Sequence, residues 1–343
     1  MAASSGLRSG KSRVIRIALD AMGGDFAPAV PVTGAIEALS ELPASCQIQL
    51  IGREADVRAE LDKHDVSQDR LLVIDAEEVI EMNEKPLAAI RGKRRSSIRV
   101  GLELQKAGES DAFISAGNTG AVMAASTLFL GLHPGVDRPA IAALFPTAGK
   151  PALVLDAGAN VDCSPRELRG FAHIGSVYAR DVLGRSDPSV GLLNIGEEEE
   201  KGNEAVRNTY ELLANDPGIR FVGNVEGRDI LSGACDVTVC DGFVGNVLLK
   251  FYETVAHLFR GLLEREMEQS VLRGDGMRRV FKVLDYSEYG GAPLLGVRGV
   301  SIICHGRSPS RAIKNAIGVA LQSVESKLNQ HIAAEFASRE SVT

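Results

Sequence analysis

The chain has 343 residues, of which 45% are hydrophobic and 5% aromatic, and its formal net charge is -7. The scarcity of aromatic side chains argues against a surface that stacks on nucleic-acid bases, and the acidic balance argues against wholesale binding of polyanions. The cysteines are scattered and never spaced as CxxC, which indicates neither a disulfide framework nor a zinc site. Without a signal-like or bilayer-length apolar stretch, we expect a cytoplasmic protein that holds no metal.

The first half of the chain alternates apolar strands with helical stretches. Such alternation predicts right-handed βαβ crossovers and an α/β fold with a mostly parallel sheet flanked by helices. Only TAGK separates the strands at 140–146 and 151–158, which predicts a hairpin inside that sheet. The predicted strands here span 13–21, 48–52, 71–76, 111–117, 140–146 and 151–158, and the predicted helices span 31–42, 53–64 and 120–130.

The second half continues this alternation until a long helical segment begins at residue 247. Apolar residues recur at helical spacing over 247–269, and a basic amphipathic stretch follows up to residue 285, so we predict a helical pair that projects from the sheet. Ser308 and Pro309 fit the N-cap and first position of the last helix. The other predicted elements are helices at 165–184, 203–215 and 308–328 and strands at 189–196, 219–225, 235–242 and 299–306.

We predict a single α/β domain over residues 13–335, which includes the projecting helical pair at 247–285. The polar ends at 1–12 and 336–343 are predicted to be flexible tails.

Several apolar strands end abruptly in glycine-rich polar turns, namely DAMGGD, SAGNTGA, LDAGAN, NIGEEEEKGNE and DGFVGN. In an open parallel sheet the strand carboxyl ends face one crevice, so we expect these turns to form one site whose backbone amides hold an anion such as phosphate. SAGNTGA favours this role because it precedes a helix start, although it lacks the lysine of a P-loop. Ordinary interpretations are glycine turns without a ligand, a solvated charge run around Lys201, and an N-cap role for Asn246.

Two further features have both a functional and a structural interpretation. His305 is the only histidine placed at a strand end where chemistry fits, and a polar turn residue is equally consistent. The basic cluster Arg91, Lys93, Arg94 and Arg95 is either a solvated helix entrance or a patch for an acidic partner.

In this order, the segments DAMGGDFAP, ISAGNTGA, LDAGANVDC, NIGEEEEKGNE, DGFVGNVLLK and HGRSPSRAIKNAI closely resemble the bacterial phosphate acyltransferase family PlsX. The resemblance covers the chain from about Arg16 to the last helix. It implies transfer of a long-chain acyl group from acyl-carrier protein to inorganic phosphate, which gives an acyl phosphate for a downstream membrane glycerol-3-phosphate acyltransferase. It also implies a homodimer, a fold similar to isocitrate and isopropylmalate dehydrogenases and to phosphotransacetylases, and no cofactor.

By this resemblance Lys201 binds and steers the phosphate, and Asn246 donates a hydrogen bond to the thioester oxyanion. The first motif departs from the family because Phe26 stands where a histidine is usual, and the last motif reads HGRSPSR in place of HGSSDAK. The residues expected to shape the pocket or bind phosphate are Asp20, Gly23, Gly24, Asn118, Thr119, Gly120, Asn160, Asp241 and His305.

The implied function also suggests partners for two surfaces. The cluster Arg91, Lys93, Arg94 and Arg95 would dock the acidic carrier protein. The pair at 247–285 would serve dimerisation and, through Leu272 and Phe281, reversible contact with the inner face of the cytoplasmic membrane, with an ordinary core helix pair as the alternative. Competing functions are a phosphotransacetylase-like or decarboxylating dehydrogenase-like enzyme and a module that only presents acyl chains.

Overall fold

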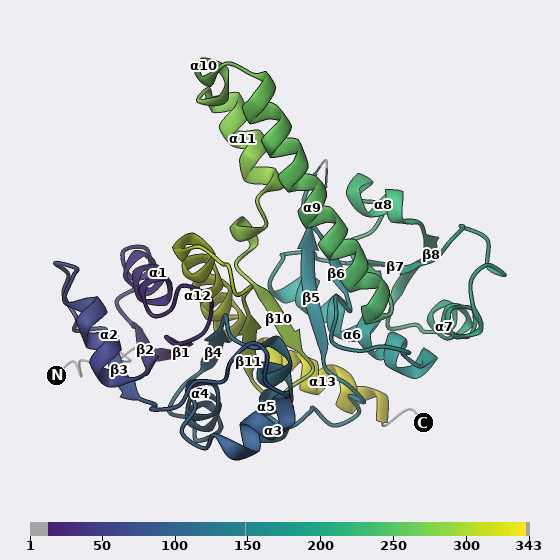
Figure 1. Cartoon of the computed structure of the whole chain (residues 1–343). Coiled ribbons are helices and arrows are strands. Elements are labelled where there is room, and N and C mark those ends of the chain that lie inside the picture. The colour runs from purple at the N-terminus through teal and green to yellow at the C-terminus, as the bar shows by residue number, and fades with distance from the viewer. Residues whose placement is uncertain (1–12, 148, 341–343) are drawn as a thin grey trace, which may run out of the picture.

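A mixed sheet of eleven strands forms the centre of the computed structural model, which describes residues 13–147 and 149–340 (Figure 1). The spatial order of the strands is β3-β2-β1-β4-β11-β10-β5-β6-β9-β7-β8. The strands are β1 Ile15–Asp20, β2 Cys46–Gly52, β3 Leu71–Asp75, β4 Ala112–Ser115, β5 Ala140–Phe145, β6 Ala152–Leu155, β7 Ser189–Leu193, β8 Arg220–Val225, β9 Val237–Val239, β10 Ala292–Leu295 and β11 Val300–Ile303.

Two parallel half-sheets meet at the centre through antiparallel strands. The predicted hairpin is confirmed as the antiparallel pair β5 and β6, in which Phe145 lies opposite Ala152. Strand β10 is antiparallel to both of its neighbours, β11 and β5. Because these successive reversals leave the two halves running in opposite directions, the expectation that all the glycine-rich turns share one sheet edge is wrong. The mostly parallel α/β fold itself is confirmed.

Helices cover both faces of the sheet (Figure 1). Leu19 of β1 packs with α1, α2 and α12, and Leu153 of β6 packs with α6 and α13. The alternate residues Ala18 and Val154 face the other side, where α3, α4, α5 and the first half of α9 share one core. The helices are α1 Ala29–Leu39, α2 Glu54–Leu61, α3 Pro86–Gly92, α4 Ser97–Lys106, α5 Thr119–Leu130, α6 Pro165–Asp181, α7 Glu204–Ala214, α8 Gly227–Ser232, α9 Gly242–Glu266, α10 Gln269–Leu272, α11 Asp275–Leu284, the 3-10 helix η1 Tyr286–Tyr289, α12 Ser310–Glu325 and α13 Leu328–Glu340.

Three predicted helix ends are corrected by the structure. Helix α9 begins at Gly242 rather than at residue 247, and Asp241 is its N-cap, so Asn246 lies inside the helix. Helix α12 begins at Ser310 with Pro309 as N-cap, so Ser308 does not cap it. The predicted flexible tail at 336–343 is wrong up to residue 340, because α13 continues to Glu340. The tail predicted at 1–12 and residues 341–343 lie outside the described residues.

Helix α9 rises away from the sheet, and α11 returns alongside it (Figure 1). The guanidinium of Arg260 in α9 lies 5.3 Å from the ring centre of Phe281 in α11, so these helices contact each other directly. Leu272, between them, is buried with only 8% of its surface exposed. Leu272 therefore offers little surface for the membrane contact predicted for it. Among the described residues, no helix is both long and apolar enough to span a bilayer.

Candidate active site

A cavity of about 190 Å³ lies at the centre of the sheet, beneath the first half of α9. Thr119 enters it from the start of α5, and Gly158 from the turn after β6. Asn246 enters it from α9, and His305 from the turn after β11. This central cavity thus brings together the ends of strands from both half-sheets, which the opposite strand directions would otherwise keep apart.

Two glycines in the first turn of α9 allow Asn246 to reach the central cavity. A Cβ atom at Gly242 would overlap the carboxylate of Asp156, and one at Gly245 would overlap its carbonyl oxygen. Gly158 has φ of +131°, and a Cβ atom there would lie 3.3 Å from the side chain of Asn246. The helix start therefore packs directly on the turn after β6, which fixes the position of the Asn246 amide.

Asp156 holds the turn after β6 in shape. Its carboxylate accepts hydrogen bonds from the backbone N–H groups of Ile141, Gly158, Ala159 and Asn160. The side-chain amide of Asn160 donates to the same carboxylate over 2.9 Å and to a carbonyl oxygen over 2.8 Å. Both donors of that amide are therefore engaged within the protein. Burial raises the pKa of Asp156 in spite of these hydrogen bonds.

Asp20 plays a similar part at the end of β1. It is 1% exposed and accepts hydrogen bonds from the Ser115 hydroxyl over 2.6 Å and the Met22 backbone N–H over 3.0 Å. Burial raises its pKa. A Cβ atom at Gly23 would lie 2.6 Å from the Asp20 carboxylate, so the glycine permits the close turn. Asp20 thus joins the turns after β1 and β4 and does not line the central cavity.

Gly24 explains how the first turn meets the last one. It has φ of +100°, and a Cβ atom there would lie 3.0 Å from the carbonyl oxygen of Gly306. The backbone N–H of Asp25 donates to that same oxygen over 2.8 Å. The DAMGGD turn therefore supports the turn that carries His305, and Gly23 and Gly24 act through backbone shape.

The side chain of Asn118 is fully used within the protein. Its oxygen caps α5 by accepting from the Ala121 N–H over 3.0 Å, and its amide donates to the carbonyl oxygens of Glu81, Met82 and Glu84. A contact between Asn118 and phosphate would therefore have to come from its backbone. The neighbouring Thr119 is exposed and lines the central cavity.

Gly120 and Asp241 are also explained by local structure. A Cβ atom at Gly120 would lie 2.6 Å from Pro86, so a small residue is needed where α5 meets α3. The Asp241 carboxylate accepts from the backbone N–H groups of Phe243 and Cys163, each over 2.8 Å. The Asp241 side chain is thus used as the N-cap of α9 and as an acceptor for the turn before α6.

Lys201 is exposed in the loop between β7 and α7 and does not line the central cavity. The loop is held by hydrogen bonds from Asn194 to the Lys201 carbonyl over 3.1 Å and from Asn224 to the Glu198 carbonyl over 2.8 Å. The structure therefore does not place Lys201 and Asn246 in one pocket. Asn203, two residues beyond Lys201, lines a different cavity, described below.

Lys250 and Glu253 were missed by the sequence reasoning. Both line the central cavity, and they form an ion pair of 2.9 Å. They follow Asn246 by four and seven residues, which is the spacing of one helix face. The spacing of Asn246, Lys250 and Glu253 in the sequence is the signal that could have found them. The central cavity thus contains a cation close to Asn246.

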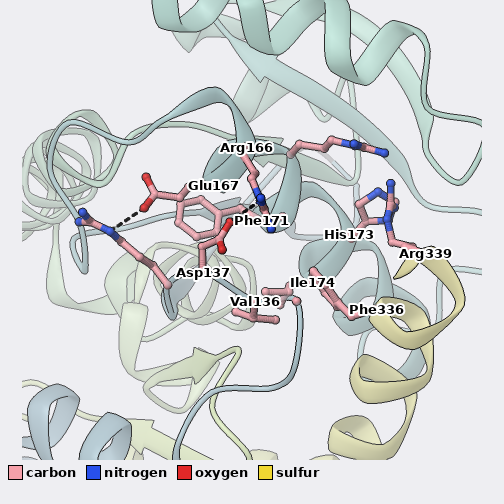
Figure 2. Close-up of a pocket in the computed structure, with 13 residues that line it drawn as sticks. Val136, Asp137, Arg166, Glu167, Phe171, His173, Ile174, Phe336 and Arg339 are labelled. Atoms are coloured by element: carbon pink, nitrogen blue, oxygen red, sulfur yellow. Dashed lines mark hydrogen bonds and ion pairs between the residues drawn. The ribbon is translucent and has the colours of Figure 1, made fainter. Parts of the chain in front are cut away.

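A separate cavity of about 360 Å³ lies between α6, α13 and the segment before β5 (Figure 2). Arg166 pairs with Asp137 over 2.8 Å, and Arg138 pairs with Glu167 over 2.6 Å, across its polar side. Phe336 of α13 lies on its apolar side (Figure 2). The other two arginines of its wall, Arg169 and Arg339, pair with Asp216, so every arginine that lines this cavity faces a carboxylate.

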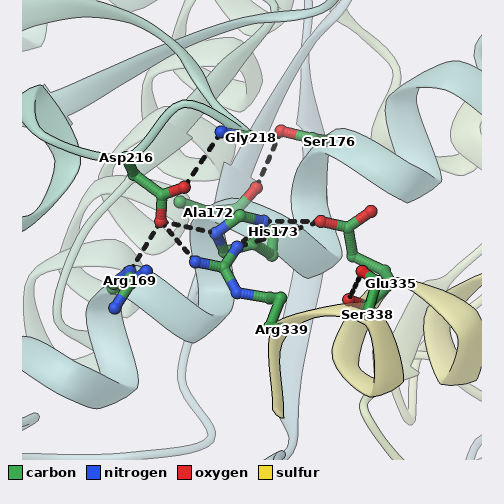
Figure 3. A network of polar contacts seen from close by, with 9 residues as sticks. All are labelled: Arg169, Ala172, His173, Ser176, Asp216, Gly218, Glu335, Ser338 and Arg339. Atoms are coloured by element: carbon green, nitrogen blue, oxygen red, sulfur yellow. Dashed lines mark hydrogen bonds and ion pairs between the residues drawn. The ribbon is translucent and has the colours of Figure 1, made fainter. Parts of the chain in front are cut away.

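A polar network beside this cavity fastens α13 to α6 (Figure 3). The Asp216 carboxylate accepts from Arg169 over 2.6 Å and from Arg339, and it lies 2.9 Å from a ring nitrogen of His173. Glu335 contacts the other nitrogen of His173 over 2.9 Å. Burial alone would raise the pKa of Asp216, but the arginine hydrogen bonds outweigh it and lower the pKa to about 2.

The predicted docking cluster divides into paired and exposed side chains. Lys93 donates to Glu84 and to the Val79 carbonyl oxygen, and Arg95 pairs with Asp75 over 2.7 Å. Arg91 and Arg94 are exposed and form no ion pair with the described part of the chain. Among the residues described, no group of histidine, cysteine or acidic side chains is arranged to hold a metal ion.

Comparison with known proteins gives one consistent result. A family model described as fatty acid synthesis protein matches residues 15–331. The phosphate acyltransferase of Heliobacterium modesticaldum is 51% identical over 91% of this chain and 94% of its own length. That of Synechococcus elongatus is 50% identical over 92% and 93%, and that of a Nostoc species is 46% identical over 95% and 97%.

Solved structures resemble the chain in fold. A phosphotransacetylase from Streptococcus pyogenes has a TM-score of 0.64 at 18% identity and covers 91% of this chain and 94% of its own. A branched-chain phosphotransacylase from Enterococcus faecalis has a TM-score of 0.55 at 13% identity, with coverage of 90% and 99%. At these identities the similarity establishes the architecture alone.

Proposed function

Because the chain belongs to the fatty acid synthesis protein family, whose curated relatives are named phosphate acyltransferase, we propose that it transfers a long-chain acyl group from acyl-carrier protein to inorganic phosphate. A phosphate oxygen forms a bond to the thioester carbonyl carbon, and the carbon–sulfur bond breaks. The products are an acyl phosphate and the carrier thiol. No oxidant or reductant is consumed.

The observation that carries this proposal is the content of the central cavity. Asn246 provides an amide donor for an oxyanion, Lys250 provides a cation, and Thr119 provides a hydroxyl. Cys304 also lines the cavity, but burial raises its pKa to about 12, which disfavours the thiolate that a covalent mechanism needs. The arrangement suits a reaction in which phosphate is itself the nucleophile.

Each side chain then has a distinct role in the transfer. The Asn246 amide donates to the carbonyl oxygen as it becomes an oxyanion, a type of contact worth about 10² to 10³ in turnover. Lys250 attracts the phosphate and offsets its charge during attack. Lys201, in the exposed loop outside the cavity, steers phosphate by its positive charge. His305 and Thr119 complete the polar wall.

The carrier protein docks on the exposed arginines Arg91 and Arg94. An acidic partner gains encounter rate from such unpaired cations, whereas Lys93 and Arg95 are already neutralised by neighbouring carboxylates. The double substitution Arg91→Glu and Arg94→Glu should raise KM for carrier-bound substrate and weaken its salt dependence. An equal rise in KM for a small soluble thioester would contradict docking at this site.

The projecting helices form a homodimer contact and touch the membrane surface, so the protein is peripheral on the inner face of the cytoplasmic membrane. Large apolar side chains remain exposed on α9 at Phe251 and Phe259 and on α11 at Val280 and Val283. The last two lie beside Arg278 and Arg279, a combination typical of interfacial helices. Val280→Glu with Val283→Glu should reduce binding to anionic vesicles while leaving acyl transfer in solution intact. Unchanged vesicle binding would exclude α11 as the contact.

Release of carrier thiol tests the proposed reaction. Palmitoyl-carrier protein should lose its thioester only when phosphate is present, without NAD or Mg²⁺. A decarboxylating dehydrogenase would require NAD instead, and a presenting module would bind the carrier without thioester loss. A phosphotransacetylase-like enzyme would prefer short acyl groups on coenzyme A.

A further inference from the structure

An apolar cavity of about 590 Å³ adjoins the first turn of α9 on the side of α6 and α7. It is lined from the carboxyl ends of β7 and β9, the loop before α6 and the first turns of α6, α7 and α9. Its apolar side chains include Leu168, Leu192, Leu193, Val206, Phe243 and Val244. Phe243 is 62% exposed, so the cavity opens at that residue.

We propose that this apolar cavity holds the hydrocarbon chain of the acyl group and sets the preferred chain length. The inference rests on the function proposed above. The apolar cavity, at about 590 Å³, is about three times as large as the central cavity of about 190 Å³. It therefore offers more room for a long acyl chain.

The charge of the lining also favours a hydrocarbon. Among the described residues that form the wall there is no lysine or arginine, and the carboxyl groups of Asp162 and Asp241 are present. A phosphate there would meet negative charge without a compensating cation. Two thiols, those of Cys163 and Cys240, are nearly buried and add to the weakly polar wall.

The apolar cavity lies between the loop of Lys201 and the helix of Asn246, two residues that do not share the central cavity. Phe243 and Asn246 are three residues apart on α9, so a chain that passes Phe243 brings its carbonyl group to Asn246. Asn203 lines the apolar cavity and follows Lys201 in the same loop. The thioester thus lies at the first turn of α9, between the Lys201 loop and the central cavity that receives phosphate.

The substitution Ala205→Phe tests this assignment, with Ala214→Phe as its matched control. Ala205 is half-buried in the first turn of α7 and lines the apolar cavity, whereas Ala214 is exposed at the end of the same helix. The measurement is kcat/KM for palmitoyl- and octanoyl-carrier protein. A phenyl ring displaces several methylenes, each worth roughly a factor of four in binding, so the palmitoyl-to-octanoyl ratio should fall at least tenfold in Ala205→Phe only.

Photo-crosslinking gives a readout that is independent of turnover. A palmitoyl thioester with a terminal diazirine should label peptides containing Leu168, Leu192 or Val206 in the wild-type protein, and this labelling should be lost in Ala205→Phe. Labelling confined to the projecting helices, or an unchanged chain-length ratio, would overturn the inference. The inference would also be overturned if Ala205→Phe dissociated a dimer and lowered kcat/KM equally for palmitoyl- and octanoyl-carrier protein. That result would mean that a second copy of the chain covers the cavity. If the wild-type protein transfers neither acyl group to phosphate, the proposed function fails instead.

Discussion

Buried carboxylates are stabilised in opposite ways in two regions of this molecule. Around the central cavity, Asp20 and Asp156 accept hydrogen bonds from hydroxyl, amide and backbone N–H groups, and burial raises the pKa of both. At the junction of α6 and α13, Asp216 accepts from Arg169 and Arg339, and its pKa falls to about 2 (Figure 3). The same residue type thus lacks a cation in one region and is surrounded by cations in the other.

The difference follows from what each region has to do. In the proposed function the central region admits phosphate, and there the oxygens of Asp20 and Asp156 accept from neutral donors rather than from arginines. Arginines paired with these carboxylates would be less available to attract the phosphate. The junction has only to hold a terminal helix, so strong ion pairs are appropriate there. We therefore expect substitutions in the central region to reduce turnover and substitutions at the junction to reduce stability.

Asn246→Ala should have the largest effect and should confine it to turnover. Loss of an oxyanion donor lowers turnover by on the order of 10² to 10³, whereas the unfolding midpoint should stay close to that of the wild type because the side chain buries little apolar area. Lys201→Ala should lower turnover in the same direction. Steady-state kinetics and urea unfolding on the same preparations measure both quantities. Wild-type turnover in both variants would refute these roles.

Asp216→Ala should do the reverse. It leaves Arg169, Arg339 and His173 without their shared carboxylate, and breaking a buried pair by removing one partner costs about 3 kcal/mol in unfolding free energy. Turnover per folded molecule should be unchanged. Glu288→Ala, which removes a partner of Arg311 near the central cavity, offers a comparison for general loss of ion pairing. A large fall in kcat for Asp216→Ala would show that the two regions are coupled.

The acid dependence of stability should come from the junction. The pKa of Asp216 is about 2 against a usual 3.8, and that of Glu335 is lowered from 4.5 by its hydrogen bond to His173, so both carboxyls bind protons more readily in the unfolded chain. Their stabilisation is complete above about pH 4.5 and is lost as the pH falls towards 2. Urea unfolding at a series of pH values across this window gives the unfolding free energy as a function of pH, and this free energy should change less steeply with pH for Asp216→Asn than for the wild type. An equal pH dependence in both proteins would place the acid sensitivity in other residues.

Asp20→Asn should have the smallest effect on stability, because Asn keeps the size of the side chain and its oxygen can still accept from the Met22 N–H. The Asn amide can donate to Ser115 while the hydroxyl oxygen still accepts from Gly117, so the expected change is below about 1 kcal/mol. Thermal or urea unfolding measures it. If Asp20→Asn destabilised the protein as much as Asp216→Ala, buried carboxylates in both regions would contribute equally to stability, and the contrast between the two regions would be wrong.

The fold was largely predictable from the sequence, whereas much of the site was not. Periodicity and a four-residue connection were enough for the α/β class and the β5–β6 hairpin, because both are local properties. The opposite directions of the half-sheets depend on where β10 pairs, which lies far along the chain from β5. Helix α13 did leave a signal, since Leu328, Ile332 and Phe336 recur at helical spacing and pack in one core.

Some residues of the site were predictable from the sequence and others were not. Asn246, Thr119 and His305 were identified from motifs, and the structure brings them to one cavity. Asn118 and Asn160 look like ligands in sequence because their backbone partners cannot be seen from spacing. Residues that bind substrate and residues that support a turn share the same glycine-rich motifs, so only the hydrogen-bond partners distinguish them.

The central claim is that phosphate attacks the acyl thioester directly, and product analysis tests it most directly. Palmitoyl-carrier protein and isotopically labelled phosphate are incubated with the protein, and the acyl product is trapped with hydroxylamine. The account predicts labelled acyl phosphate, trapped as palmitoyl hydroxamate in equal amount to the thiol released, and much less of both with Asn246→Ala. Free palmitate in place of hydroxamate, or thiol release without phosphate, would contradict it.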